Sequence, residues 1–497
     1  MEGYYVFNPA YRLRNDKKRI VLFNKEPHSL SFDKVSDFVG FVHPLYAILF
    51  SFFNGERALE EVKEAFSNLT GLSKEAVEKI ITPLMENKEE LAINYDGHHF
   101  HFPKNVLVKK ENGLIHQKYN IKEFLIPKKE LDFDSWRLYI PLDALIMINT
   151  KCVTDCIYCY ADVRKRKDCQ IPIERFKELI KEAKELGMRS IDISGGEVFL
   201  YKHWEELLEE LVVNGFSPYI STKIPIELDK IQKLRDLGIK TIQLSIDTIV
   251  EEEIVKILNV KKGYLSKMLK TLEYLNENDF NILINTQMTL INENSMEKLV
   301  DYLMRFDNIK KIQVGAAGYS LYKNNYLKYR ASLQKVKQVE KFINRVKANK
   351  SKEVFLNFSG YLTKEDFLND NVEERKKKFY SRARCSGNFY AFVILPDGKV
   401  TICEELYWHP QFIIGDLMKQ SIEEVWNSEK ALKLYNISRE MVREESPCRE
   451  CDEFEKCHRY RGVCWKMVLY AYEWENWDFP DPRCPKAPIP KRNFWIE

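Results

Sequence analysis

The 497-residue sequence lacks a strong charge of either sign. Its 77 Lys and Arg residues nearly balance its 74 Asp and Glu residues, which leaves a net charge of +3. Proteins that bind nucleic acid usually carry a basic excess, so no nucleic-acid partner is expected. With 30% charged and 45% hydrophobic residues, the composition is that of a folded chain and not of a disordered one.

Long apolar runs are also missing. The most apolar stretch, Leu45 to Phe53, is interrupted by Ser51 and is too short to span a bilayer. The first residues, Met1 to Tyr5, contain neither the basic segment nor the apolar segment of an export signal. We therefore expect a cytoplasmic protein with no membrane partner.

Cysteine is absent from two long stretches, residues 1–151 and 170–384. Of the eleven cysteines, four lie within 152–169 and seven between Cys385 and Cys484. An odd number cannot pair completely, and a chain of this length needs no disulfides to fold. In a reducing compartment, clustered cysteines usually indicate metal or redox chemistry.

The length predicts about three domains. Residues 1–100 contain a predicted hairpin, Tyr11–Arg14 and Arg19–Phe23, followed by three helical patterns, which together are typical of a winged-helix-like module. The helices are expected at Pro44–Phe53, Ala58–Ser67 and Ser73–Ile81, the last capped by Ser73 and ended or kinked by Pro83. A linker is expected at 101–139.

Residues 140–350 alternate strands with amphipathic helices. The candidate strands are Ala144–Asn149, Ser190–Ser194, Ser217–Thr222, Thr241–Ile246, Ile282–Leu290 and Ile312–Gly315. This alternation predicts an α/β fold with a parallel sheet, interpreted as a partial (β/α)6 TIM-like barrel. The Lys- and Arg-rich stretch 347–378 is interpreted as a solvated connector, and we place the connector domain at 351–384 and a cysteine-rich domain at 385–497.

Three cysteines follow the first barrel strand directly, in Cys152-Val153-Thr154-Asp155-Cys156-Ile157-Tyr158-Cys159. Loops after the strands form the active face of such barrels. Three thiolates on one loop suit three irons of a four-iron cube and leave one iron open. Taken alone, the spacing is equally compatible with part of a zinc site. At the end of the second strand, Gly195-Gly196-Glu197 offers close backbone approach and an acid that can hold an amine.

These residues together resemble the radical S-adenosylmethionine superfamily, whose hallmark is CxxxCxΦC, with Tyr158 as the aromatic. The resemblance covers about 145–320. It implies that Cys152, Cys156 and Cys159 hold a [4Fe–4S] cluster whose open iron binds S-adenosylmethionine. It further implies that Gly195, Gly196 and Glu197 contact the methionyl amine, that Ser221 and Thr222 contact the cofactor, and that Ser245 meets the ribose. Reductive cleavage would then give a 5′-deoxyadenosyl radical that abstracts hydrogen from an unactivated carbon.

The back of the chain carries a second cysteine pattern. Cys385, Gly398 and Cys403 flank a predicted hairpin, Phe389–Leu395 and Val400–Cys403, and Cys448-x2-Cys451-x5-Cys457-x6-Cys464 and Cys484 follow. Cys-x2-Cys alone favours structural zinc. The whole segment resembles the SPASM domain, with six residues in place of three before Cys464.

That resemblance implies two auxiliary [4Fe–4S] clusters. Cys385, Cys403 and Cys464 would ligate the first, and Cys448, Cys451, Cys457 and Cys484 the second. The first then has three evident ligands. Its remaining iron is either open to a substrate thiolate or carboxylate, or filled by Cys169 or a non-cysteine side chain. Cys169 is interpreted as a spare thiol.

The hairpin and three helices of residues 1–100 resemble the RiPP recognition element, in which a leader peptide adds as a strand beside the hairpin and packs on the third helix. The acidic helices, with Glu60, Glu61 and Glu64, argue against a DNA-binding winged helix. The three resemblances together imply a maturase that binds a ribosomally made precursor peptide, takes electrons from a flavodoxin or ferredoxin, and forms an intrapeptide cross-link.

A thioether is the favoured link and a carbon–carbon bond is possible; epimerisation would need a hydrogen donor, for which Cys169 is the unassigned thiol. The alternatives are an anaerobic sulfatase-type maturase that forms formylglycine, and a non-enzymatic zinc protein that binds peptides. Tyr319, Tyr322 and Asn285 are candidates for the cavity wall, although core packing is the favoured role for each.

Overall fold

The computed structural model describes residues 3–27, 38–111, 117–161, 166–323, 325–349, 354–361, 371–382, 384–458 and 463–492. The chain divides into two compact units, Met1–Ile140 and Pro141–Glu497. Within the described ranges, no helix combines the length and the apolar character needed to cross a membrane.

The described residues of the first unit form three small antiparallel sheets and three α-helices. Its strands are β1 (Tyr5–Phe7), β2 (Tyr11–Asn15), β3 (Ile20–Asn24), β4 (Val39–Val42), β5 (Leu91–Tyr95), β6 (His98–Phe102) and β7 (Leu107–Lys109). Its helices are α1 (Pro44–Phe52), α2 (Leu59–Thr70) and α3 (Lys74–Glu86), with short 3-10 turns at Ile121–Phe124 and Lys128–Glu130.

The expected hairpin is confirmed and extended. β2 pairs with β3 antiparallel from Tyr11↔Asn24 to Asn15↔Ile20, and β4 adds to β3 to give the order β2-β3-β4. The Ser73 hydroxyl caps α3 by accepting from the Ala76 amide at 3.3 Å, as expected. The expectation that the helix ends at Ile81, before Pro83, is wrong. Pro83 lies inside α3, which continues to Glu86.

Residues 101–139, expected as a linker, are instead part of the first unit. β6 ends at Phe102, and β7 pairs with β1 through Phe7↔Leu107. Farther along, the buried Arg19 guanidinium contacts the backbone oxygens of Ser135 and Arg137, and its partner Asp16 accepts from the Ile140 amide at 2.9 Å. A solvated connection would not supply these buried hydrogen bonds.

The second unit begins with a parallel sheet in barrel order. Its strands are β8 (Asp143–Met147), β9 (Ser190–Ser194), β10 (Ser221–Thr222), β11 (Thr241–Ser245), β12 (Asn281–Met288), β13 (Ile309–Ala316) and β14 (Phe355–Ser359). β8 pairs parallel with β9, and β10 to β14 pair parallel in sequence order. A single parallel bridge, Ile193↔Ile220, joins the two groups in the described part of the chain. All six expected strands are present.

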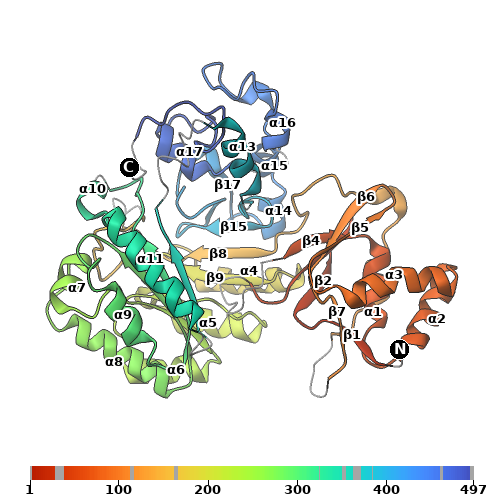
Figure 1. The fold of residues 1–497 in the computed structure, drawn as a ribbon, viewed down its shortest axis with the longest axis horizontal. Helices are drawn as coiled ribbons and strands as arrows, with labels where there is room; N and C mark the ends of the chain where they lie inside the picture. The colour runs from red at the N-terminus through yellow and green to blue at the C-terminus, as the bar shows by residue number, and fades with distance from the viewer. Residues whose placement is uncertain are drawn as a thin grey trace. The chain divides into compact units, whose positions relative to one another are not determined.

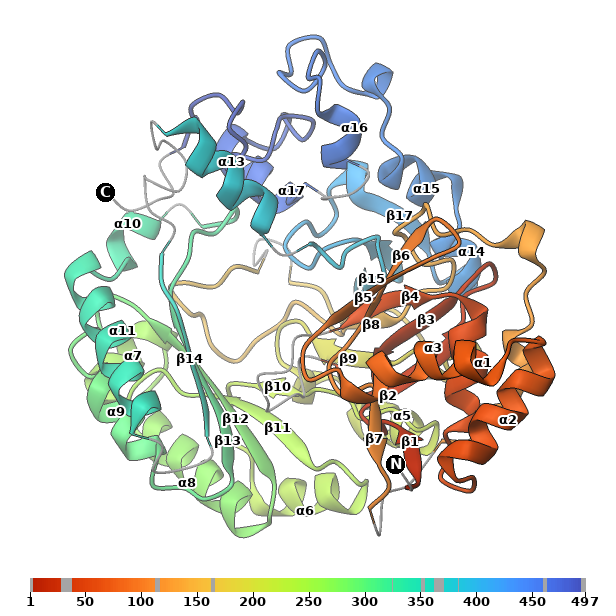
Figure 2. The same ribbon diagram turned by 45° about the vertical axis from the view of Figure 1, so that its right-hand side comes forward.

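Helices follow the strands. They are α4 (Ile173–Glu185), α5 (Trp204–Val213), α6 (Leu228–Asp236), α7 (Glu251–Leu258), α8 (Tyr264–Glu277), α9 (Met296–Leu303), α10 (Tyr326–Tyr329) and α11 (Leu333–Ala348). Figure 2 shows α6, α8, α9 and α11 along the outer face of the curved sheet formed by β11 to β14. The opposite face is left for the site.

A seventh strand corrects the interpretation of 347–378 as a solvated connector. β14 lies inside that stretch, pairs with β13 through Ile312↔Leu356, and buries Leu356, which is 5% exposed. The Lys and Arg residues that suggested a solvated segment flank this strand on both sides.

The cysteine-rich region adds α13 (Val372–Ser381), β15 (Ala391–Ile394), β16 (Lys399–Thr401), β17 (Ile413–Asp416), α14 (Ile422–Trp426), α15 (Glu429–Tyr435), α16 (Phe454–Lys456) and α17 (Trp465–Tyr472). β15 and β16 form the expected hairpin around Gly398, whose φ is +83°. β15 also pairs parallel with β8, from Ala391↔Asp143 to Ile394↔Ile146. The barrel sheet therefore continues into this region, as β8 and β15 show in Figure 1.

Candidate functional site

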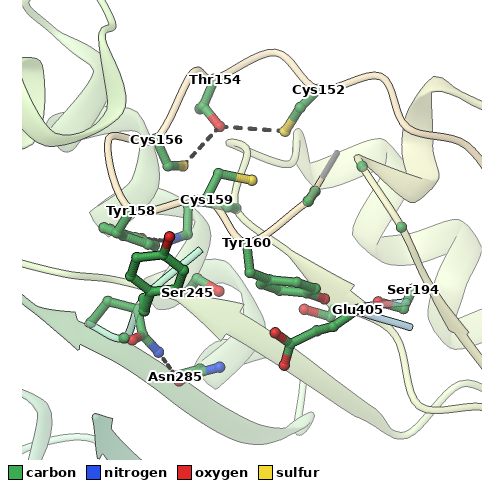
Figure 3. A pocket seen from close by; sticks show the side chains of 18 of the residues that line it. Cys152, Thr154, Cys156, Tyr158, Cys159, Tyr160, Ser194, Ser245, Asn285 and Glu405 are labelled. Atoms are coloured by element: carbon green, nitrogen blue, oxygen red, sulfur yellow. Dashed lines mark hydrogen bonds between the residues drawn. The ribbon is translucent and has the colours of Figure 1, made fainter. Parts of the chain in front are cut away.

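The first cysteine loop leaves β8 and is held by backbone hydrogen bonds. The amides of Asp155 and Ile157 donate to the carbonyls of Leu258 and Ile257, at 2.9 and 3.0 Å, at the end of α7. Inside the loop, the buried Thr154 hydroxyl lies 3.3 Å from the Cys152 sulfur and 3.4 Å from the Cys156 sulfur (Figure 3). These contacts hold the thiols at the carboxyl end of the sheet.

Gly195 and Gly196 allow the loop to approach β9 closely. A Cβ at Gly196 would lie 1.8 Å from the Lys151 carbonyl oxygen, and one at Gly195 would lie 2.4 Å from that of Asn149. Gly195 also has a φ of +124°, which side chains rarely adopt. Two backbone hydrogen bonds form across this close approach. The Gly196 amide donates to the Asn149 carbonyl at 2.8 Å, and the Glu197 amide donates to the Lys151 carbonyl at 2.7 Å. The glycine pair thus fixes the entry to the cysteine loop.

Glu197 is buried, with 1% of its surface exposed. Its carboxylate accepts from the Thr222 hydroxyl at 3.0 Å and from the amides of Phe199 and Lys223 at 3.2 and 3.3 Å. Burial raises its pKa to about 7, and the hydrogen bonds oppose that rise. The carboxylate therefore joins the end of β9 to the end of β10.

A cavity of about 500 Å³ lies at the carboxyl ends of the strands. Figure 3 shows the three thiols grouped on one side of it, with Ser245 and Asn285 on another. Of the residues expected to bind cluster or cofactor in the barrel, the cavity is lined by Cys152, Cys156, Cys159, Tyr158, Gly195, Gly196, Ser221, Thr222 and Ser245, and Glu197 stands behind this wall. Asn285 and Tyr319 also line the cavity, whereas Tyr322 instead donates to the Glu405 carbonyl at 2.8 Å.

A buried network on one wall was not expected from the sequence. The Tyr158 hydroxyl donates to Asp247 at 2.5 Å, and the Lys223 ammonium lies 3.0 Å from the same carboxylate oxygen and 4.8 Å from the Tyr158 ring centroid. Burial and the Asp247 carboxylate both raise the pKa of Tyr158. The network fixes the aromatic ring of the cysteine motif and places one cation in the cavity wall.

The cysteine-rich region closes the cavity from the other side. Glu405, Lys466, Met467 and Tyr470 line it, and the Glu405 carboxylate contacts both the Lys466 ammonium and the Tyr470 hydroxyl. Next to it, Tyr160 of the cysteine loop donates to Glu404 at 3.1 Å. Residues more than 240 positions apart therefore meet in one site.

The C-terminal cysteines fall into two spatial sets. Cys385 raises the pKa of both Cys403 and Cys464, after the larger effect of burial and of nearby carboxylates. Burial raises the pKa of Cys448 to about 12, with Cys484, Cys451 and Cys457 as further causes. These neighbours place Cys385 near both Cys403 and Cys464, and Cys448 near Cys451, Cys457 and Cys484. Cys169 lies apart from both, with its thiol 3.7 Å from the Ile171 carbonyl and close to Tyr201.

The donor chemistry fits iron–sulfur clusters. Within the described ranges, no three Cys, His, Asp or Glu side chains are gathered tightly enough to hold a single metal ion. The three barrel thiols border a cavity with room for a larger group, and all eleven cysteines are unpaired thiols. Soft thiolates of this kind are the usual ligands of iron–sulfur clusters.

Comparison with known proteins decides the family. The radical SAM superfamily profile matches residues 146–306, and the SPASM iron-sulfur cluster-binding domain matches residues 385–452. The chain is a radical SAM enzyme with a SPASM domain. It is 23% identical over 361 residues to the PqqA peptide cyclase of Rhodopseudomonas palustris, a match that covers 71% of this chain and 89% of that protein.

Two further similarities are to a second curated protein and to a solved structure. The radical SAM enzyme is 23% identical over 309 residues to the subtilosin biosynthesis protein AlbA of Bacillus subtilis, covering 60% of this chain and 62% of AlbA. Its fold is similar to that of Streptococcus suis SuiB, solved with its precursor peptide SuiA, with a TM-score of 0.62, 16% identity, and coverage of 97% and 99% of the two chains. At that identity the likeness to SuiB shows the fold.

The unexpected site residues differ in how far the sequence could have indicated them. Lys223 is the first residue after β10 and Asp247 is the second after β11. Barrel residues reach the active face at these positions, so strand ends were a usable signal. Glu405 and Tyr470 reach the cavity only through tertiary packing of the SPASM domain, and no local pattern marks them.

Proposed function

We propose that this radical SAM enzyme modifies a ribosomally made precursor peptide by forming an intrapeptide cross-link, with a thioether favoured and a carbon–carbon bond possible. The observation that carries the proposal is the shared cavity, in which Cys152, Cys156 and Cys159 line one side and Glu405 and Tyr470 of the SPASM domain line another. A peptide segment in this space would lie between the cofactor and the auxiliary cysteines.

The proposed ligand sets are those that the family resemblance implies, and the grouping of the thiols supports them. Cys152, Cys156 and Cys159 would hold the [4Fe–4S] cluster that binds S-adenosylmethionine, which when bound supplies a carbon-centred radical able to remove a hydrogen atom. Two auxiliary [4Fe–4S] clusters would be held by Cys385, Cys403 and Cys464, and by Cys448, Cys451, Cys457 and Cys484. Flavodoxin or ferredoxin would supply the reducing electron.

The chain's own residues would bind and orient the cofactor and exclude water. Ser221 and Ser245 present hydroxyls to the cavity and share Gln243 as a hydrogen-bond partner, at 2.9 Å for Ser245. Glu197 holds the end of β10 in place through Thr222. The methionyl amine would meet the backbone at Gly195 and Gly196, with the Glu197 carboxylate behind them. Tyr158 is fixed by Asp247 beside the thiols.

Residues 1–100 would bind the leader peptide as a RiPP recognition element. The three-stranded sheet β2-β3-β4 followed by α1, α2 and α3 supports this proposal, because an extended peptide can add to such a sheet and pack on a helix. Removing the leader, so that only the core peptide is offered, is expected to reduce kcat/KM without changing the nature of the product.

Forming a cross-link changes the mass of the peptide by a defined amount. Forming C–S from C–H and S–H transfers one hydrogen atom to the 5′-deoxyadenosyl radical and releases one proton to solvent and one electron, which an auxiliary cluster would accept. The product is therefore lighter than the precursor by two hydrogen atoms, whereas an epimer has unchanged mass. Formylglycine would instead carry an aldehyde that reacts with a hydrazide probe.

The test is anaerobic reconstitution with iron and sulfide, followed by S-adenosylmethionine, dithionite and the peptide encoded beside this gene. We expect a brown protein, 5′-deoxyadenosine, and a peptide lighter by two hydrogen atoms in mass spectrometry. The matched control replaces Cys152, Cys156 and Cys159 by Ala. A colourless zinc protein that releases no 5′-deoxyadenosine would overturn the proposal, as would a hydrazide-reactive product.

A further inference from the structure

A second, much smaller cavity is lined by residues of the cysteine-rich region alone. Its volume is about 30 Å³, and Cys385 and His458 both line it, together with Val463 and Trp465. Val463 and Trp465 are the residues on either side of Cys464. The cavity therefore borders one of the three thiols assigned to the first auxiliary cluster, Cys385, and the two residues that flank a second in the sequence.

His458 is buried in this cavity among aromatic side chains. It is 9% exposed, and its ring packs on Phe454 with centroids 4.3 Å apart and lies 6.1 Å from the Trp465 ring. Among the residues that the structure describes, neither ring nitrogen makes a hydrogen bond.

Another buried histidine of the same domain has a hydrogen-bond partner for each of its ring nitrogens. His409 is 5% exposed, and both of its nitrogens are used: Nδ1 accepts from the Gln411 amide at 3.2 Å, and Nε2 lies 3.0 Å from the Trp474 carbonyl. Its role is structural. His458 is similarly buried but has no such partners within the described ranges, which singles it out.

The ligand count of the first auxiliary cluster points to the missing partner. Cys385, Cys403 and Cys464 supply three thiolates for four irons, and Cys169 lies elsewhere, beside Tyr201. In the sequence, His458 begins the six-residue segment between Cys457 and Cys464, which is the one place where the chain departs from the SPASM spacing. Imidazole is an accepted iron ligand in iron–sulfur proteins.

We propose that an imidazole nitrogen of His458 is the fourth protein ligand of the first auxiliary cluster. The proposal rests on the proposed function in one respect, namely that this cluster is present. It assigns the cluster to electron transfer, because four protein ligands leave no iron open to a substrate thiolate or carboxylate. Replacing a thiolate by neutral imidazole makes a cluster easier to reduce, as in Rieske centres, so this cluster should have a higher potential than its His458→Cys counterpart.

The test uses the reconstituted full chain in which histidine alone carries ¹⁵N, reduced and examined by pulsed EPR. We expect a ¹⁵N coupling on one cluster signal, lost in His458→Gln and kept in His409→Gln, the matched buried control. His458→Cys should retain the iron content and the cluster signal, without the nitrogen coupling and with a lower midpoint potential. That variant keeps the result interpretable if His458→Gln loses the cluster.

Two results would overturn the proposal, and iron analysis distinguishes them. A protein with the iron of three clusters but no histidine-derived coupling, or with a coupling that survives His458→Gln, would refute His458 as the ligand while leaving the cofactor content intact. A protein whose iron accounts for only two clusters would remove the first auxiliary cluster itself, and with it both this ligand and that part of the proposed function.

Discussion

Substituting Gly196 by Ala should displace the cysteine loop from the barrel. The added Cβ would lie 1.8 Å from the Lys151 carbonyl oxygen, and that oxygen is backbone, so it cannot rotate away. Relief requires β9 and the loop to separate, which weakens the hydrogen bonds from Gly196 to Asn149 and from Glu197 to Lys151. Overpacking costs about 1–3 kcal/mol and the two bonds about 1 kcal/mol each, together roughly 3–5 kcal/mol.

This loss can be measured as a melting shift together with the cluster content. An unfolding entropy of about 2 cal/mol/K per residue over the Pro141–Glu497 unit converts the loss into a decrease of roughly 4–7 °C. Iron per chain should also fall by one cluster, since the displaced loop carries Cys152, Cys156 and Cys159. Spectroscopy of the reduced protein would show which cluster is lost.

Gly318→Ala is the matched control. Gly318 lines the same cavity, but a Cβ there meets no described heavy atom within 4 Å. We expect this variant to keep the unfolding temperature and the iron content of the parent. If Gly196→Ala behaved like Gly318→Ala, the close approach of loop and strand would not constrain the site, and the glycine pair would not fix the entry to the cysteine loop.

Three further predictions concern burial. Because Glu197 has its pKa raised from 4.5 to about 7, the folded state keeps a proton that the unfolded state releases, so stability should fall by about 3 kcal/mol as pH rises through that window. Glu197→Gln should flatten this slope in unfolding measurements from pH 5 to 8, and an unchanged slope would contradict the assignment. Lys223→Met leaves the 1%-exposed Asp247 without its cation and should cost about 3–5 kcal/mol. Adding Asp247→Asn should recover most of that loss, and additive losses would count against the pair. Leu356→Ala should cost about 2–5 kcal/mol if β14 is a core strand, and almost nothing if that stretch is a solvated connector.

Local patterns predicted most of the barrel correctly. β9 has the expected bounds Ser190–Ser194, and the order of strands and helices follows from their alternation along the chain. β14 was missed because its five residues stand between two Lys- and Arg-rich segments, and the charge of the surroundings outweighed the short apolar pattern. Its place in the sheet is decided by pairing with β13, a contact that composition does not encode.

The candidate site likewise contains residues that could be placed from the sequence and residues that could not. Residues on strand ends, such as Ser245, could be placed from the sequence because barrel geometry brings all strand ends to one face. Glu405, Lys466 and Tyr470 could not, because their position depends on how a separate cysteine-rich segment folds back over the barrel. The Glu197 carboxylate was expected to face an amine, and its hydrogen bonds to Thr222 and two backbone amides are a tertiary detail that the motif does not contain.

The parallel pairing of β15 with β8 has a consequence for how this protein can be taken apart. The boundary at residue 384 separates two sequence families, yet Phe392 and Trp426 from one side share a buried cluster with Ile146 from the other. A fragment cut there would present β8 as an open edge of unsatisfied amides and carbonyls beside exposed apolar side chains, and should self-associate instead of staying monomeric. The two segments match different sequence families, but β8 and β9 of the barrel share one sheet with β15, β16 and β17, so neither segment should fold alone.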